Sequence, residues 1–214
     1  NFIMMSMPKL TNIESKKNKK ATKGRHSVEK ALINSAAELV GSVGPNQLSI
    51  RDIADHAGVN HAQIHHYFGG KQGLLEATYK QLAFQHVEQL KRRDIGAGNL
   101  GDEPMSDITD NYFKAIIRAV LDGNKDLLRV QVDSNLSASQ NAVIELAKLY
   151  GTKKPTSEMK AAIALIMVLE FGLSSMKPYI QEVLEISEGE MQEFYKLFFK
   201  ARVLGVNSLT KTKK

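Results

Sequence analysis

Two helix-start signals in quick succession constrain the fold of this chain more than any other feature, and both lie within residues 49–75 (SIRDIADHAGVNHAQIHHYFGGKQGLL). Ser49 is followed three positions later by Asp52. In a capping box the first side chain accepts a hydrogen bond from the backbone N–H of the third residue on, whose own side chain accepts from the cap residue in return. Here Asp replaces the usual Glu or Gln, and the pattern predicts a helix that begins at Ile50.

A second helix is predicted directly after the first. Gly58 can adopt the left-handed conformation that commonly ends a helix, because glycine has no Cβ. Asn60 then has the position of a new N-cap, and Gln63 completes a second capping box. The small side chain of Ala54 allows the two helices to cross closely. Two short helices joined by a glycine turn are a helix-turn-helix.

The outward positions of the second helix all carry side chains that can form hydrogen bonds: Asn60, His61, Gln63, His65 and His66. Asn and Gln amides can pair bidentately with adenine, and imidazole can donate to guanine or to phosphate oxygens. The alternative is an ordinary solvated helix surface. Two capping boxes and a turn glycine in so short a window favour a DNA-reading helix.

Residues 27–77 resemble the DNA-binding domain of the TetR family of transcriptional regulators. In that family a first helix, here Val28 to Val40, supports the helix-turn-helix, and a fourth helix opens with a lysine, here Lys71 after Phe68-Gly69-Gly70. The resemblance implies that Gln63 and its neighbours face the major groove and that Tyr67 and Lys71 contact phosphate. His65 stands where the family usually carries a tyrosine, which weakens the expectation of a phosphate contact there. The expected DNA-contacting residues are Ser49, Arg51, Asn60, His61, Ala62, Gln63, His65, His66, Tyr67 and Lys71.

The net charge of +6 falls on the first 30 residues, which hold eight Lys and Arg against two Glu. A basic arm ahead of a DNA-binding domain suggests contact with phosphates or a minor groove and a strong salt dependence. Because the second helix of the pair has no Lys or Arg, positive charge would come from Arg51, Lys71 and this arm. A solvated, flexible tail over residues 1–26 is the alternative.

Helical periodicity continues through the rest of the chain, and no stretch alternates as a strand would. We therefore expect an all-α protein with a basic flexible arm (1–26), a helix-turn-helix DNA-binding domain (27–72) and a larger helical ligand-binding and dimerisation domain (73–210). Residues 94–106 are the strongest loop candidate. The expected helices after the DNA-binding domain span about 71–93, 107–122, 125–134, 137–150, 156–176, 179–186 and 188–204.

The last helices are the expected dimer contact. Helix-turn-helix proteins usually bind two half-sites, and the run AAIALIMVLEFGLSSM is apolar on more than one face. A four-helix interface between two copies, which the family resemblance also implies, would bury such helices. A monomeric core is the alternative. The residues proposed for the interface are Met191, Phe194, Tyr195, Phe198 and Phe199.

The family resemblance implies a small-molecule pocket among the middle helices, whose occupation changes the spacing of the reading heads and releases a palindromic operator. The residues expected to line it are Tyr112, Phe113, Ile116, Ile117, Arg118, Leu128, Arg129, Met167 and Glu170, although apolar residues at helical spacing more often form plain core. Glu170 lies inside an apolar run, so it must be paired, protonated or at an interface. Repression rather than activation follows from the resemblance alone.

Other classes of protein are less well supported. His61 and His65 have the spacing of two zinc ligands, but no carboxylate lies in their helix, so we expect no metal site. The sequence has no nucleophile elbow or phosphate-binding glycine loop, and we expect neither an enzyme nor a cofactor. An architectural or nonspecific DNA binder without an effector stays open as an alternative.

The absence of cysteine is compatible with a reducing cytoplasm. Asn1 to Met7 lack the charged region of a signal peptide, and the longest apolar run is too short for a membrane span. We therefore expect a soluble, cytoplasmic protein.

Overall fold

The computed structural model describes the backbone of residues 11–96 and 110–210, and the side chains of these residues from Gly24 onward. In this part of the chain the regular structure is all helical, as predicted from the periodicity. The helices are α1 (Thr11–Val43), α2 (Ile50–Ala57), α3 (Ala62–Phe68), α4 (Lys71–Arg92), α5 (Asp110–Leu121), α6 (Lys125–Asp133), α7 (Ala138–Leu149), α8 (Ser157–Val183) and α9 (Met191–Thr210).

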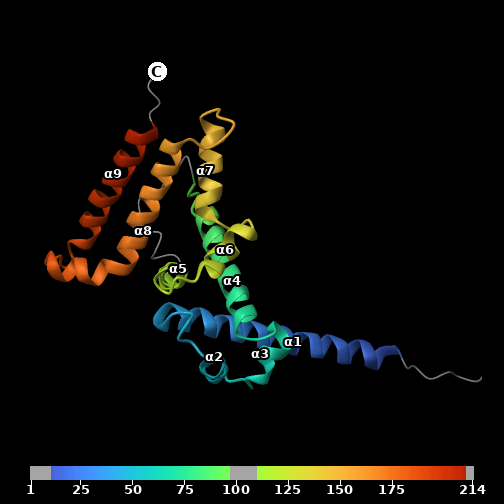
Figure 1. The fold of residues 1–214 in the computed structure, drawn as a ribbon. Coiled ribbons are helices and arrows are strands. Elements are labelled where there is room, and N and C mark those ends of the chain that lie inside the picture. The colour runs from blue at the N-terminus through green and yellow to red at the C-terminus, as the bar shows by residue number, and fades with distance from the viewer. Residues whose placement is uncertain (1–10, 97–109, 211–214) are drawn as a thin grey trace, which may run out of the picture.

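The helices form a base and an upright bundle (Figure 1). α1 runs along the base with α2 and α3 beneath it, and its N-terminal end projects beyond α3. α4 rises from the base into the bundle, where it meets α6 and α7, while α8 and α9 lie side by side. The helix-turn-helix is therefore at one end of the molecule and the long C-terminal helices are at the other.

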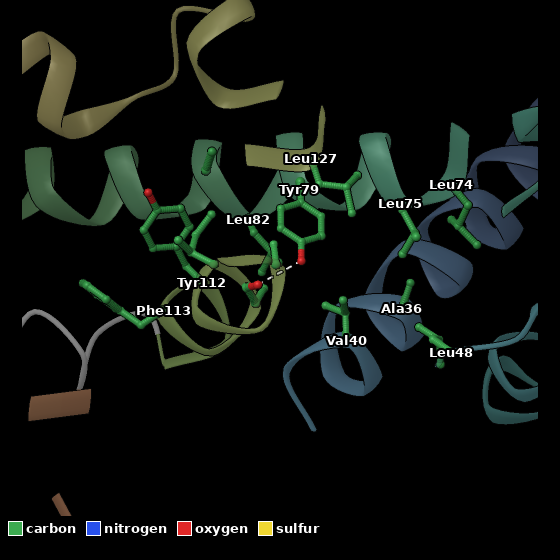
Figure 2. Packing of buried hydrophobic residues seen from close by; sticks show 14 of the residues in the cluster. Ala36, Val40, Leu48, Leu74, Leu75, Tyr79, Leu82, Tyr112, Phe113 and Leu127 are labelled. Atoms are coloured by element: carbon green, nitrogen blue, oxygen red, sulfur yellow. Dashed lines mark hydrogen bonds between the residues drawn. The ribbon is translucent and has the colours of Figure 1, made fainter. Parts of the chain in front are cut away.

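A continuous core joins the base to the bundle through α4 and α5. The hydroxyl of Tyr79 on α4 donates to the backbone carbonyl of Ala115 on α5 at 2.9 Å (Figure 2). Gly41 on α1 approaches α5 so closely that a Cβ there would lie 3.1 Å from the Cβ of Lys114. Because α5 contacts both α1 and α4, a shift of α5 would directly displace the helices that support the helix-turn-helix.

Two helix boundaries differ from those expected. α1 begins at Thr11 rather than near Val28, so the backbone of residues 11–26, expected as part of a flexible arm, is helical. α8 continues through Pro178 to Val183, where two helices separated near Met176 were expected. A proline removes one helical hydrogen bond. The Ser175 hydroxyl donates to the Phe171 and Gly172 carbonyls one turn before the proline, and α8 packs against α9.

The other boundaries agree within a few residues, except that α9 extends to Thr210 instead of ending near Leu204. Residues 97–106 of the expected loop lie outside the described part of the chain. By length and composition α8 could cross a membrane, a property that core helices of soluble proteins share. The candidate is weak evidence, since a buried Glu170–Arg202 ion pair ties the middle of this helix to α9.

Candidate nucleic-acid interface and cavity

The first predicted capping box is present at the start of α2. The Ser49 hydroxyl accepts from the Asp52 N–H at 3.1 Å, and the Asp52 carboxylate accepts from the Ser49 N–H at 3.1 Å. Hydrogen bonds from Ser49 favour the charged carboxylate and lower the pKa of Asp52. Gly58 ends the helix in the left-handed conformation, with φ of 65°. The turn into α3 therefore follows from residues within a short local segment.

The second predicted capping box is absent, and His61 rather than Asn60 has the N-cap position. The Asn60 side chain accepts from the Ala62 N–H at 2.9 Å, two residues on rather than three, so α3 begins at Ala62. This is the short-range bond of an Asx turn, which an asparagine forms readily. The prediction that Gln63 returns a hydrogen bond to Asn60 was wrong. Its Oε1 atom is buried and has no hydrogen-bond partner among the described residues.

α3 presents a polar surface at the base of the molecule. Asn60, His61, Ala62, His65 and His66 are exposed, while Gln63 and Tyr67 are half-buried. Ile64 points the other way and is fully buried against the core. The expected DNA-contacting residues on α3 thus share one accessible face.

Three further expected residues surround this face. Ser49 and Arg51 are exposed at the start of α2. The guanidinium of Arg25, from α1, lies 5.3 Å from the centre of the Tyr67 ring, which links α1 to the end of α3. Lys71 is the first residue of α4 and donates from Nζ to the Asn46 carbonyl at 3.1 Å. Its ammonium is therefore anchored beside the α1–α2 loop.

Asn46 also connects this loop to the bundle. Its backbone N–H donates to the Asp122 carboxylate at 3.1 Å, and its side-chain amide donates to the Asp122 carbonyl at 3.2 Å. Gly44, with φ of 87°, passes so close that a Cβ would lie 2.9 Å from the same carboxylate. Asp122 follows the end of α5, so the loop before α2 is fastened directly to the helix that lines the cavity described next.

A cavity of about 190 Å³ lies between α4, α5, α7, α8 and α9. Four of the residues expected in a ligand pocket line it: Tyr112, Phe113, Met167 and Glu170. The other five lie outside it. Ile116 is buried in the core, Leu128 is partly buried against that core, and Ile117 is half-buried on α5. Arg118 and Arg129 are exposed. These five lie on α5 and α6 faces that pack elsewhere or meet solvent, which periodicity alone does not distinguish.

His86 of α4 is a cavity residue that sequence reasoning missed. Its ring stacks on that of Tyr112, with centroids 4.2 Å apart and planes 9° from parallel. Burial lowers the pKa of His86 to about 4, because the charged imidazolium would lose its hydration. Tyr112 in turn donates to the Gln131 side chain at 2.7 Å, and burial raises the pKa of Tyr112 to about 12. The sequence could have indicated this position, because His86 lies at helical spacing from Tyr79 and Leu82, which are buried on the same side of α4.

Glu170 is paired, which is one of the three states expected from its position in an apolar run. Its carboxylate accepts from the guanidinium of Arg202 on α9, and both residues are almost completely buried. The Arg202 guanidinium also lies 4.3 Å from the Phe199 ring centre. The cavity wall formed by α8 therefore carries a charge that is compensated within the chain.

Two of the residues proposed for a dimer interface are internal. Met191 and Phe199 are buried within the chain, whereas Phe194, Tyr195 and Phe198 are half-buried. The apolar residues that α8 and α9 expose are different ones. They are Met167, Val168, Met176, Tyr179, Val183, Leu197, Val203, Leu204 and Leu209. Aromatic residues at helical spacing marked the inner face of α9, while smaller aliphatic residues mark the outer face.

No group of three or more His, Asp or Glu side chains is arranged for metal binding within the described residues. His61 and His65 lie on the exposed face of the helix-turn-helix.

The fold and this surface define a helix-turn-helix DNA-binding protein. Residues 32–78 match the family model described as bacterial regulatory proteins of the tetR family. The regulator BetI of Yersinia pestis is 35% identical over 95 residues, which cover 44% of this chain and 42% of that protein. The transcriptional regulator Mb3439c of Mycobacterium bovis is 26% identical over 178 residues, covering 79% of this chain and 84% of that protein.

Two solved structures share the fold across most of the chain. One is a mutant of HlyIIR, with a TM-score of 0.57 and 15% identity, covering 88% of this chain and 100% of that one. The other is a tetR-family transcriptional regulator from Streptomyces coelicolor, with a TM-score of 0.52 and 17% identity, covering 87% of each chain. The match to the tetR family model covers residues 32–78, which is the helix-turn-helix domain. The match to BetI spans about two-fifths of the length of BetI, so the similarity is shown for that part of BetI and not for the whole regulator.

Proposed function

We propose that the protein is a dimeric, sequence-specific transcriptional repressor that binds a palindromic operator and is released from it by a small-molecule effector. Residues 27–72 would form the DNA-binding domain, and residues 73–210 would form the domain that dimerises and holds the effector. The single observation that carries the proposal is the exposed polar face of α3, presented by a capped helix-turn-helix.

Gln63 has the clearest base-reading role. A buried polar atom without a partner is costly, and native structures usually supply the missing group. The Gln63 Oε1 atom is buried and lacks a partner among the described residues, while the residue as a whole is half-buried on α3. If the side chain rotates outward on binding, a base edge in the major groove would supply both a donor and an acceptor to this amide, as adenine does to glutamine.

A second copy of the chain is needed for operator affinity. One recognition helix covers only a few base pairs, and paired half-sites lie about 34 Å apart along DNA. The number of exposed large apolar residues on α8 and α9 supports dimerisation, because burial of such side chains in an interface is favourable. As a dimer bound to its operator, the protein would repress transcription in the cytoplasm.

Release of DNA by an effector is supported by the contacts that connect the cavity to the helix-turn-helix. Tyr112 and Phe113 line the cavity from α5, and the residue after that helix, Asp122, holds Asn46 in the loop before α2. Lys71 donates to the same Asn46. A ligand that displaces α5 would therefore act on both the helix-turn-helix and the start of α4. An effector shifts the equilibrium only by its difference in affinity for the two arrangements.

Two substitutions separate base reading from phosphate contact. Gln63→Ala should cost about 1–3 kcal/mol on the preferred operator and relax selectivity at one base pair. Lys71→Ala should weaken binding to all sequences alike and lower the salt slope by about one. Both are measured by fluorescence anisotropy on operator and scrambled duplexes over a series of salt concentrations.

Gln72→Ala is the matched control, because Gln72 is exposed on α4 and its amide bonds Glu76 rather than facing the α3 surface. It should leave both selectivity and salt slope unchanged. Unaltered operator selectivity in Gln63→Ala would contradict the base-reading role of this residue.

A further inference from the structure

The cavity between α4, α5 and α8 is walled by a connected array of aromatic rings. His86 stacks face to face on Tyr112 at 4.2 Å and meets Phe113 edge-on at 5.3 Å. Phe113 in turn meets Phe171 of α8 at 4.9 Å and an angle of 65°. All four residues line the cavity. Ring arrays of this kind add a further ring favourably, in stacked or edge-on geometry.

Among the described residues, the buried part of the wall has no uncompensated charge. Glu170 is ion-paired with Arg202 inside the chain. The His86 imidazole is neutral at physiological pH, since burial lowers its pKa to about 4. The two other charged residues along the cavity, Lys91 and Glu145, are exposed and of opposite sign. A charged ligand would lose its hydration here without gaining an uncompensated counter-charge.

The volume limits the size of the occupant. At about 190 Å³ the cavity is slightly larger than an apolar cavity of about 150 Å³ that is known to hold benzene. One or two fused rings would fill it. Among its uncharged polar side chains, Ser139 and Asn141 on α7 can exchange hydrogen bonds with a hydroxyl or an amide.

We propose that this cavity binds an uncharged aromatic molecule of one or two rings that carries a single hydrogen-bonding group. The identity of the site as an effector site rests on the proposed function, whereas the ligand class rests on the ring array, the compensated charges and the volume. The ring of the ligand would stack within the array of His86, Tyr112, Phe113 and Phe171, and its polar group would point toward α7.

The test uses matched probes with the full chain in isothermal titration calorimetry. Benzyl alcohol and indole are the neutral aromatic probes. Benzoate and benzylammonium carry the same ring with a charge of either sign, and cyclohexylmethanol matches benzyl alcohol without the aromatic ring. We expect the neutral aromatic probes to bind, the charged ones at least about tenfold more weakly, and cyclohexylmethanol about threefold more weakly.

A variant pair locates the binding. Phe113→Leu keeps an apolar side chain but removes a ring from the array, and should weaken benzyl alcohol binding by about two- to tenfold. Phe84→Leu is the matched control, because Phe84 lies on α4 with 48% of its surface exposed and does not line the cavity. If Phe113→Leu fails to fold, Phe171→Leu replaces it, since Phe171 is only half-buried.

Equal or tighter binding of benzoate or benzylammonium would overturn the proposal, as would equal binding of cyclohexylmethanol or no binding of any probe. An equal loss in the Phe113 and Phe84 variants would also overturn it. The proposed function is read out separately by operator binding in the absence of probes. Probe binding without operator binding would reject the proposed regulator function and support the proposed ligand class. Operator binding without probe binding would support the regulator function and reject the ligand class.

Discussion

Gly73 is the residue at which backbone packing between α3 and α4 is tightest. A Cβ at this position would lie 2.0 Å from the carbonyl oxygen of Phe68, the last residue of α3. That atom belongs to the backbone, so it cannot move without displacing the end of the recognition helix. Only glycine permits this approach.

Gly73→Ala should therefore lower the free energy of unfolding by about 1–3 kcal/mol, the usual cost of overpacking, and should lower operator affinity as well. Urea denaturation followed by circular dichroism measures the first effect. Gly24→Ala is the control, because nothing lies within 4 Å of a Cβ there and alanine favours helix. If Gly73→Ala were as stable as Gly24→Ala, the close approach would be refuted.

His86 gives the protein a specific dependence of stability on pH. Its pKa is lowered to about 4 in the folded chain from a usual value of 6.5, because the buried imidazole resists protonation. Below the usual pKa the unfolded state binds the proton and the folded state does not, so stability falls as the pH drops from about 6.5 toward 4. The loss across this pH window should reach a few kcal/mol, since each pH unit that separates the folded and unfolded pKa values is worth about 1.4 kcal/mol.

This prediction is checked by urea denaturation at a series of pH values. His86→Gln should flatten the profile between about pH 4 and 6.5, whatever its effect at neutral pH. His66→Gln, at an exposed position on α3, should leave the slope as it is in the unmodified protein. An identical slope in both variants would mean that His86 is not the group responsible.

At the scale of elements, the contact between the α1–α2 loop and the end of α5 is the most specific link in the molecule. Asp122→Ala removes the carboxylate that accepts from the Asn46 N–H. Amide hydrogen exchange at Asn46 and at the start of α2 should become faster, while α8 and α9 stay protected. Asp133→Ala is the control, since its carboxylate forms an exposed pair with Arg129. Unchanged exchange at Asn46 in Asp122→Ala would contradict the link.

Short sequence patterns predicted correctly those helices whose ends are fixed by contacts between residues close in the sequence. α2 was predicted correctly because Ser49 and Asp52 bond each other within one helical turn. The predicted box at Gln63 was wrong because Asn60 uses a shorter bond, and both bonds suit the same residue types. The break expected near Pro178 was also wrong, since α8 runs through Pro178 to Val183.

The cavity was predicted less well because it depends on contacts between distant helices. Tyr112 and Phe113, which the family resemblance suggested as wall residues, line the cavity, whereas Ile116, suggested with them, lies in the core. His86 was missed because its surroundings come from α5 and α8, far along the chain. The apolar run predicted that Glu170 is paired, protonated or at an interface, and the fold identifies Arg202 as its partner.

For the whole molecule, the outer face of α8 and α9 is the proposed contact with a second copy. Val168 is 68% exposed and Leu204 is 61% exposed, and apolar side chains this open favour burial in an interface. Val168→Glu and Leu204→Glu should each convert a dimer to monomers at micromolar concentration, because an unpaired charge in an apolar interface costs several kcal/mol. Analytical ultracentrifugation measures the change.

The matched control is Leu149→Glu, since Leu149 is 66% exposed at the end of α7 and outside this face. It should leave the dimer intact. Operator affinity should fall in the two interface variants and not in the control. Should all three variants sediment alike, the interface would have to lie elsewhere.

The central claim, sequence-specific DNA binding by a dimer, is tested most directly by selecting bound duplexes from a random pool with the purified protein at two salt concentrations. We expect enrichment of a palindrome whose half-sites lie about one helical turn apart, and its persistence at the higher salt. Recovery of unrelated sequences, with binding lost as salt rises, would contradict the claim. The protein would then bind DNA through charge alone.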